Sequence, residues 1–454
     1  LVAMGAQDVY LTGNPQITFF KVVYRRHTNF SKECIEQTFT GSIPSTAEGS
    51  VSCTLSRNGD LVQEIYLKAT VVPNPSDGNE VTSNTNITGG AANKITVASA
   101  PQNGVKIYIT DVGNLKIGGV VPNVNDAFLV AGRTATTFTL TDLNGTATGA
   151  LTGDLSAANK ALKFKTDAVQ LDNDDMTDLI KTVEVEIGGQ KIDKHYSQWL
   201  DIYNELFETS HDLRYAMANG SQTAVNVNTK THYIPLRFWF NRNPGLALPL
   251  IALQYHEVKI NMTLNPARST GNGASMSEAK LLVNYLYLDT DERRRFAQVS
   301  HEYLIEQVQH TGVESSTPID MNFNHPVKAL FWTAAVDPGK VKIQLNGHDR
   351  AAEQPHDYYH LVQPYESGLG HSGKSLDNDA RTWGPVVNTA DTQCVGMYSF
   401  CLKPAEHQPS GTCNFSRIDN ARLNVGAATS LYLFALNYNV LRIMSGMGGL
   451  AYSN

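Results

Sequence analysis

One stretch of the chain fits a nucleotide-binding pattern letter for letter. Residues Gly368–Ser375 have the sequence GLGHSGKS, which satisfies the phosphate-loop motif G-x-x-x-x-G-K-[ST]. In a working phosphate loop a buried strand precedes the motif and a helix follows it, so that backbone amides converge on the phosphates. Residues 360–365 contain Pro364 and fit only an edge strand, and residues 376–385 have no amphipathic period. The motif therefore does not predict nucleotide binding.

Two histidines have a spacing that metal sites use. His356 and His360 are four residues apart, which places two imidazoles on one face of a helix and also on one face of a strand. Neighbouring aromatic residues and prolines argue against a helix, and no carboxylate is placed beside the pair. We expect these to be histidines of a loop or an interface, and the sequence predicts no metal site.

Other catalytic patterns are missing from the sequence. The chain contains neither a nucleophile elbow G-x-S-x-G nor a zinc motif H-E-x-x-H. The acidic run Asp172–Asp175 has no partner motif and is typical of a solvated loop. The sequence therefore predicts no catalytic residue, no cofactor and no enzyme.

Three asparagines lie in sequons of the form N-x-[ST] and are candidates for glycosylation: Asn86, Asn144 and Asn219. Sequons are common by chance, and attachment of a sugar needs the right compartment or a dedicated enzyme. We keep the three as candidate modification sites.

The elements around these residues form an internal repeat. Val183–Ile192 aligns without a gap with Val341–Arg350, which begins 158 residues later (341 − 183 = 158). Both copies alternate apolar and polar residues, the pattern of a β-strand. They then place Gly-Gly or Asn-Gly where a two-residue hairpin needs positive φ. The repeat predicts one β-domain built twice.

A second pair of segments supports this duplication. Tyr233–Phe240 leads through a turn to the alternating strand Val258–Leu264, and Met397–Leu402 leads through a turn to Ala421–Val425. The order of elements is the same, and a repeat this long indicates duplicated domains rather than a solenoid. A catalytic site gains little from such doubling, whereas a protein that tiles a surface with near-equivalent lobes gains much. The pattern favours a structural role.

The first copy is assembled from short strands typical of a sandwich. We expect strands at residues 17–24, 35–39, 50–55 and 61–72. We expect two helices, at 196–208 and 289–296. In the first, apolar side chains recur at helical spacing and would lie on a sheet: Trp199, Ile202, Tyr203, Leu206 and Phe207.

An interruption at about 75–165 separates the two parts of the first copy. Its composition changes to Thr, Asn, Gly, Ala and Val with few charges, and it contains strand candidates at 95–98, 105–109, 128–130 and 138–140. A flexible low-complexity loop is the alternative, but Phe128, Phe138 and the alternation favour a small folded β-module. Insertions of this size are tolerated at exposed loop tips, so we expect the module to project from the body.

Composition limits the classes of partner. The chain has 454 residues, and only 17% are charged, against roughly 25% in an average soluble domain. With a net charge of −7, no global field attracts nucleic acid or anionic lipid. The five cysteines show neither a disulfide framework nor a zinc spacing. Without a signal peptide or a membrane-spanning stretch in the sequence, we expect a soluble product made in a reducing cytoplasm.

Several long phrases, including Gly5–Lys21 (GAQDVYLTGNPQITFFK) and Pro244–Glu257 (PGLALPLIALQYHE), are highly specific. Together with 24–30, 56–61, 409–420 and 437–452 they occur at both ends and in the middle of the chain. In these phrases the sequence resembles the major capsid proteins of large icosahedral nucleocytoplasmic DNA viruses, especially those of chlorella viruses and their relatives.

The resemblance implies an all-β double jelly roll of two eight-stranded antiparallel sandwiches, with a small β-module inserted in a loop of the first. The first jelly roll with its N-terminal arm would occupy 1–290, interrupted by the insert 75–165, and the second would occupy 291–454. Three chains would form a trimer with a pseudo-hexagonal outline that tiles the outer shell of the virion. The N-terminal segment would face the inside, and loops at the other end would form the outer surface.

The implied partners are neighbouring capsomers, minor capsid proteins and an internal viral membrane that lies nearby and is not spanned. Sequence-specific nucleic-acid binding is not implied, and assembly would take place in the host cytoplasm. The insert is longer than the corresponding loop of the family, so its surface is not carried over. Two other classes stay open on the residues alone: a lectin-like sandwich that binds carbohydrate, and a metal-dependent enzyme of the cupin type.

Overall fold

The strands of the protein follow the alternation of apolar and polar residues. In β16 (Val258–Leu264, VKINMTL), every second side chain is buried, because successive side chains of a strand point to opposite faces. The computed structural model describes residues 5–72, 80–82, 94–96, 106–111, 116–117, 127–131, 137–141, 151–152, 163–166, 179–208, 213, 217, 230–266, 275–315, 317–334, 338–350, 352–369, 394–426 and 430–452.

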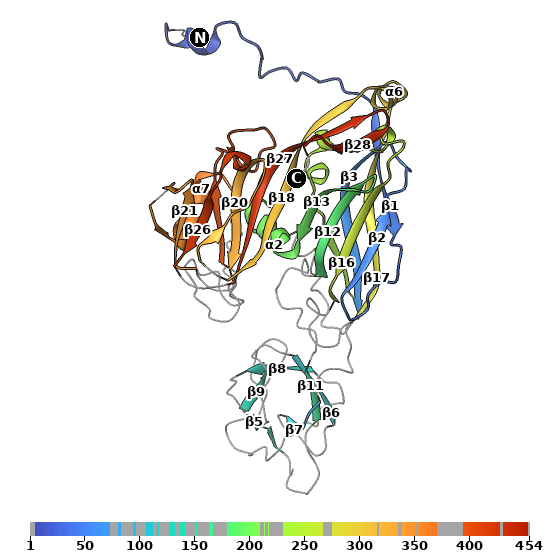
Figure 1. Ribbon diagram of the computed structural model, residues 1–454. Coiled ribbons are helices and arrows are strands. Elements are labelled where there is room, and N and C mark those ends of the chain that lie inside the picture. Colours follow the sequence, from blue (N-terminus) through green and yellow to red (C-terminus); the bar gives the residue numbers. More distant parts are fainter. Residues whose placement is uncertain are drawn as a thin grey trace.

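The first lobe is a sandwich of two antiparallel sheets (Figure 1). Its first sheet has the order β1 (Phe30–Thr38), β17 (Ser275–Leu288), β3 (Leu61–Val72), β14 (Lys230–Pro235), with β15 (Leu248–Pro249) beside β3. Its second sheet has the order β13 (Gln190–Tyr196), β12 (Ile180–Ile187), β16, β2 (Gly49–Thr54).

The second lobe repeats this arrangement. Its first sheet has the order β18 (His301–Glu314), β27 (Leu431–Met444), β20 (Pro326–Ala334), β24 (Cys394–Ser399). Its second sheet has the order β19 (Ile319–Asp320), β26 (Ala421–Val425), β21 (Lys340–Leu345), β22 (His348–Asp349). Three short strands add to these sheets: β23 (Gln354–Pro355), β25 (Cys413–Asn414) and β28 (Met447–Leu450).

Both lobes have the topology of a jelly roll. When the eight principal strands of each lobe are numbered along the chain, the sheet orders are 1-8-3-6 and 2-7-4-5 in the first lobe and again in the second. A chance pair of β-domains would not share this order of crossovers. The expected double jelly roll is confirmed, and the sequence repeat is a structural one.

The repeated hairpins use the turn that their residues predict. Gly188 and Gly189 between β12 and β13 have φ of 58° and 85°, and Asn346 and Gly347 between β21 and β22 have φ of 52° and 77°. Positive φ at both central positions is the geometry of the two-residue hairpin turn that matches the strand twist. The register of each hairpin is therefore set locally.

The interruption between β3 and β12 contains a β-module. Its six-stranded sheet has the order β4 (Glu80–Thr82), β11 (Lys163–Thr166), β6 (Lys106–Asp111), β8 (Ala127–Ala131), β9 (Thr137–Thr141), β5 (Lys94–Thr96), and β7 (Lys116–Ile117) pairs with β10 (Leu151–Thr152). In Figure 1 these strands lie apart from both lobes, at the end opposite the N-terminal segment. These strands show that the interruption contains a folded module rather than a structureless loop.

Both predicted helices are present. α2 (Ser197–Leu206) follows β13, and α6 (Thr290–Gln298) links the lobes, with the side chain of Asp289 accepting a hydrogen bond from the backbone nitrogen of Thr290 at 2.7 Å. The other helical elements are short: α1 (Asp8–Thr12), α4 (Trp239–Arg242), η2 (Pro244–Leu246), η3 (Leu250–Ala252), η4 (Tyr358–Val362), α7 (Gln363–Glu366) and η5 (Phe415–Arg417).

The strand expected at 17–24 is wrong. This segment forms no strand, and Phe19, Phe20 and Tyr24 are 90%, 99% and 85% exposed. β-propensity describes how well a side chain fits a half-buried pleated surface, and these residues pack on no such surface in the described part of the chain. Chain entry into the first sheet begins only at Phe30, where β1 pairs with β17.

The expectation of non-helical structure around His356 and His360 is also wrong. Residues from His356 to Glu366 are helical, as a π-helical turn (η4) that runs into α7. Pro364 is the second residue of α7 and directly follows the π-helical turn, so the proline lies where the helical hydrogen-bond pattern changes.

The hairpin turns give a test of the backbone argument. Alanine at either Gly188 or Gly189 would adopt a left-handed conformation that costs about 1–2 kcal/mol. At Gly188 the added Cβ would also overlap the ring of His256, whereas at Gly189 nothing lies within 4 Å. We expect Gly188→Ala to lower the unfolding free energy by at least about 1 kcal/mol more than Gly189→Ala, because overpacking adds to the backbone strain. Urea denaturation of the two variants measures this difference, and equal losses would contradict the argument.

Candidate functional site

The two lobes are joined by α2, which belongs to the first lobe in sequence and packs against the second. Trp199, Ile202 and Leu206 are at most 1% exposed. They contact apolar side chains on the outer face of the β18-β27-β20-β24 sheet: Val308, Ala329, Phe331, Val395, Met397, Phe434 and Leu436. The ring of Trp199 meets that of Phe331 edge-on, with 5.5 Å between centroids. The helix therefore seals the second lobe's sheet against water.

Hydrogen bonds between β13 and β18 fix the lobes in register. The carboxylate of Asp193 accepts a bond from the backbone nitrogen of Val308 at 3.0 Å, and the side-chain amide of Gln307 donates to the carbonyl oxygen of Ile192. The same carboxylate lies 2.9 Å from Nε2 of His195, whose ring stacks on Phe238. A buried carboxylate with several partners holds its neighbours in one geometry.

A buried ion network lies between the lobes. Glu306 on β18 is shared by Arg242 of the first lobe, at 2.6 Å, and Lys328 of the second, at 2.5 Å. The Lys328 side chain is 1% exposed and also donates to the carbonyl oxygen of Glu406 at 2.9 Å. Burial alone would lower the pKa of Arg242, but the charge and hydrogen bond of Glu306, together with Tyr203 and Asp193, outweigh burial and raise the pKa. Each charge therefore depends on the other two.

The candidate metal ligands have structural roles. Nε1 of Trp332 donates to Nε2 of His356 at 3.3 Å, and Nδ1 of His360 bonds to the carbonyl oxygen of Val395 at 2.6 Å. The two imidazoles stack with centroids 6.0 Å apart. In the part of the chain that the structure describes, no group of three His, Cys, Asp or Glu residues could hold a metal ion.

The phosphate-loop motif begins at the end of a helix. Gly368, at φ 67°, follows α7, and its backbone nitrogen bonds to the carbonyl oxygen of Tyr365. No strand comes directly before it, so the context that the motif needs is not met. Residues 370–375 of the motif lie outside the described residues, as do Asp172–Asp175 and the sequon residues Asn86, Asn144 and Asn219.

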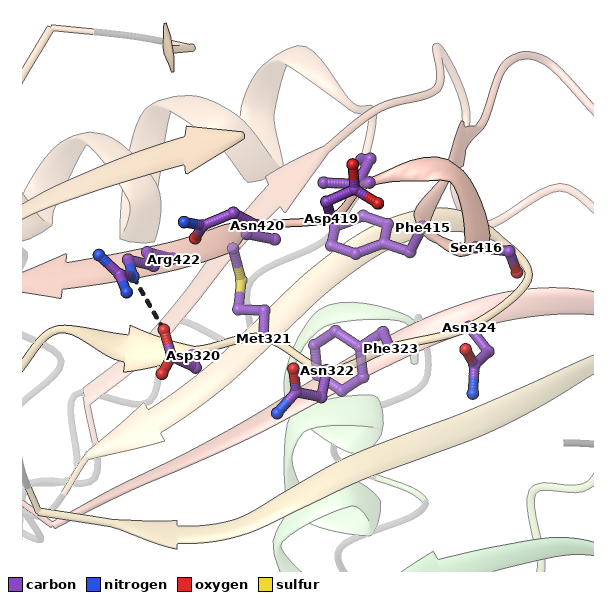
Figure 2. Close-up of a pocket in the computed structure, with 12 residues that line it drawn as sticks. Asp320, Met321, Asn322, Phe323, Asn324, Phe415, Ser416, Asp419, Asn420 and Arg422 are labelled. Carbon is purple, nitrogen blue, oxygen red and sulfur yellow. Dashed lines mark hydrogen bonds and ion pairs between the residues drawn. The ribbon is translucent and has the colours of Figure 1, made fainter. Parts of the chain in front are cut away.

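A surface hollow of about 490 Å³ lies in the second lobe (Figure 2). Its walls are the segments Asp320–Asn324 and Phe415–Arg422, and Phe323 and Phe415 make an edge-on contact across it. The Asp320–Arg422 ion pair on its wall, at 2.9 Å, is largely exposed. The hollow is open and polar, and its arginine is already paired, so it gives no sign of a ligand and we assign it none.

Many of the exposed large apolar side chains lie in the N-terminal segment, before the first strand. Besides the residues of 17–24, Tyr10 and Leu11 are 96% and 88% exposed. No helix among the described residues is both long and apolar enough to cross a membrane. Four cysteines in the described part are free: Cys34, Cys53, Cys401 and Cys413.

The contact between the lobes consists of α2, the Asp193 hydrogen bonds and the Arg242–Glu306–Lys328 network, and we call it the joint. The sequence predicted part of it. The helical spacing of Trp199, Ile202 and Leu206 predicted a helix lying on a sheet, although not which sheet. The ion network was missed. Lys328 is a single charge inside the apolar strand Pro326–Ala334 and was the available signal, because a lysine in a buried strand needs a partner.

The ion network predicts a large difference between two glutamates of the same strand. Glu306→Gln leaves Arg242 and Lys328 buried without their carboxylate, which we expect to lower the unfolding free energy by about 3–5 kcal/mol. Glu302→Gln is the matched control. Its pair with Arg442 is 60% exposed on the acid side, so its loss is at most about 1 kcal/mol. Urea denaturation compares them, and similar losses would show that the buried network does not hold the lobes.

The joint also predicts a pH dependence through His310. This side chain is packed among Tyr196, Tyr432 and Phe434, and burial lowers its pKa below the usual 6.5, opposed in part by its bond to the Leu433 carbonyl oxygen and by Glu314. Its contribution to stability is present above pH 6.5 and is lost as the pH falls through the lowered pKa, because the unfolded chain takes up the proton first. We expect His310→Phe to flatten the fall in unfolding free energy between about pH 7 and pH 5. An unchanged slope would contradict this.

Family models and curated relatives match this chain over most of its length. The family model described as "Major capsid protein N-terminus" matches residues 18–112 and 155–289, and "Large eukaryotic DNA virus major capsid protein" matches 292–337 and 381–449. The major capsid protein of Pyramimonas orientalis virus is 45% identical, with 100% of this chain and 98% of that protein covered. That of Paramecium bursaria Chlorella virus 1 is 36% identical, with the same shares covered.

Solved structures agree. The capsid protein VP54 of PBCV-1 superposes with a TM-score of 0.63 at 32% identity, covering 96% of this chain and 100% of that one. The Faustovirus major capsid protein, with a TM-score of 0.60 at 12% identity over 97% and 94% of the two chains, shares the fold. The chain therefore belongs to the major capsid protein family of large eukaryotic DNA viruses.

Proposed function

We propose that three copies of this chain associate into a trimer with a pseudo-hexagonal outline, and that these trimers tile the outer icosahedral shell of a large double-stranded DNA virus. The observation that carries the proposal is the repeated topology, with sheet orders 1-8-3-6 and 2-7-4-5 in both lobes. Three chains present six near-equivalent lobes, and units with a hexagonal outline fill a flat array. A closed ring of identical chains also leaves no open contact for uncontrolled growth.

The joint supports this role mechanically. A capsomer keeps its outline only if the angle between the lobes is fixed. Here Trp199 and the Arg242–Glu306–Lys328 network are buried between the lobes. A hinge motion would therefore expose apolar surface to water and separate the charges from their partners. For the division of the chain, we propose a first jelly roll with its arm at 1–290, interrupted by the insert 75–165, and a second at 291–454.

The two ends of the molecule suggest its orientation. The N-terminal segment and the β-module lie at opposite ends in Figure 1. We assign the module to the outer face and the arm to the inner face, where the exposed Phe19, Phe20 and Tyr24 would be covered by minor capsid proteins above an internal membrane. Assembly in the host cytoplasm accords with the four free cysteines. The net charge of −7 does not favour general nucleic-acid binding.

The sequon residues Asn86, Asn144 and Asn219 remain candidates for sugar attachment. The first two belong to the interval that we assign to the outer face. A lectin-like function, the alternative on sequence alone, has no support in the comparisons, whose curated relatives are capsid proteins.

Solution size tests the proposal directly. We expect purified protein to have a mass near three times 49.6 kDa by light scattering. We also expect electron micrographs of concentrated protein to show hexagonally packed particles. A monomer under all mild conditions would overturn the trimer, and trimers that never pack would overturn the tiling.

A further inference from the structure

The second lobe has a helical segment that corresponds to α2, and among the described residues no sheet face covers the exposed side of that segment. In each lobe a helical segment lies between the fifth and sixth principal strands: α2 in the first, and η4 with α7 in the second. α2 leaves its own lobe and covers the outer face of the next lobe's first sheet. Among the described residues, the second lobe's helical segment covers no further lobe.

The two helical segments can be aligned in sequence, although α2 is an α-helix and Tyr358–Val362 is a π-helical turn. Tyr359 corresponds to Leu200, and each is buried in the core of its own lobe. At the same separation, Leu361, Val362 and Tyr365 correspond to Ile202, Tyr203 and Leu206 of α2. Ile202 and Leu206 are at most 1% exposed, whereas Leu361, Val362 and Tyr365 are 55%, 39% and 85% exposed. Three apolar side chains thus align in sequence with those that α2 packs against the second lobe, and they face solvent.

The first lobe has the matching receiving face. The sheet β1-β17-β3-β14 occupies the place in the first lobe that β18-β27-β20-β24 occupies in the second. On its outer face Tyr66 and Leu282 are register neighbours and are half-buried, with Tyr233 in the adjacent row. On the edge strand β1, Cys34 on the same face is exposed. This face is therefore available as well.

Charges around the two surfaces are compatible. Lys68 and Lys280 on the receiving face both pair with Glu36, at 2.7 and 3.4 Å, and Lys280 also pairs with Glu278 at 2.5 Å, so the charges on this face nearly balance. Asp357 and Glu366 are exposed at the two ends of the helical segment and bring negative charge beside the apolar side chains. A receiving face with balanced charges does not repel these two carboxylates.

We propose that the helical segment His356–Glu366 of one copy docks on the outer face of the β1-β17-β3-β14 sheet of a second copy, repeating between chains the contact that α2 makes within a chain. Because the contact is head to tail, it closes into a ring when the rotation between chains is one third of a turn. The inference rests on the proposed trimer and deepens it by naming the residues of its interface. Tyr365, as the most exposed aromatic side chain of the segment, is its expected anchor.

Variants of the helical segment test this. We expect Leu361→Asp and Tyr365→Asp each to raise the concentration at which trimers dissociate by at least tenfold, measured by sedimentation. Both side chains are exposed within one chain, so the circular dichroism of the dissociated protein should match that of the parent. Leu402→Asp, which changes a leucine that is 77% exposed elsewhere on the second lobe, is the control and should remain trimeric.

The outcomes separate the two proposals. A parent protein that is a monomer would overturn the trimer itself. A trimeric parent whose Leu361→Asp and Tyr365→Asp variants dissociate no more readily than Leu402→Asp would overturn the docking site and leave the trimer intact.

A cross-linking experiment tests the receiving face. Glu366→Cys places a thiol beside the apolar side chains without changing them, and the native Cys34 lies on the proposed receiving face. A flexible bismaleimide should then join chains into covalent dimers and trimers, and adding Cys34→Ser should abolish this product. Cross-links that persist without Cys34, or a trimer that gives none, would contradict the assignment.

Discussion

The burial of one helix between two lobes is the interaction on which the remaining structure depends. α2 contributes Trp199, Ile202 and Leu206 to a core that belongs to neither jelly roll alone, and each fully buried apolar side chain contributes about 1.5–3 kcal/mol. Glu306 then binds cations from both sides of the same boundary. Hydrophobic burial stabilises the contact between the lobes, and the ion network and the Asp193 hydrogen bonds fix their relative orientation. Two sandwiches thereby act as one rigid body.

This joint explains why a duplicated fold is useful. Two identical domains on a flexible linker would sample many angles, and most of them would not close a ring. With the angle fixed inside the chain, the same relation can be repeated between chains, because each lobe offers the same strand order to its neighbour. The apolar side chains of Leu361 and Tyr365 would then make, between two chains, the contact that α2 makes within one chain. One geometry serves both inside and between polypeptides.

Much of the fold was predictable from local patterns, and the exceptions have physical reasons. The strand at Leu61–Val72, the Gly188–Gly189 and Asn346–Gly347 turns and the helix at Trp199–Leu206 depend on alternation, φ preference or helical spacing, which neighbouring residues determine. The failures involve distant partners. Ile17–Tyr24 has the composition of a buried strand but pairs with no strand among the described residues. Pro364 argues against a helix, yet it lies where a π-helical turn passes into α7. The partners of Lys328 come from β18 and the loop containing Glu406, so spacing could not reveal them.

The position of the β-module has a consequence for variation. It enters after β3, a strand of one sheet, and leaves into β12, a strand of the facing sheet, so it is a closed excursion from a single end of the sandwich. Chain added there changes no strand register and no residue of the joint, and a longer loop adds only a slowly growing entropy cost. The β-module can therefore change in sequence and length during evolution while the two lobes, which form the tiling unit, keep their dimensions.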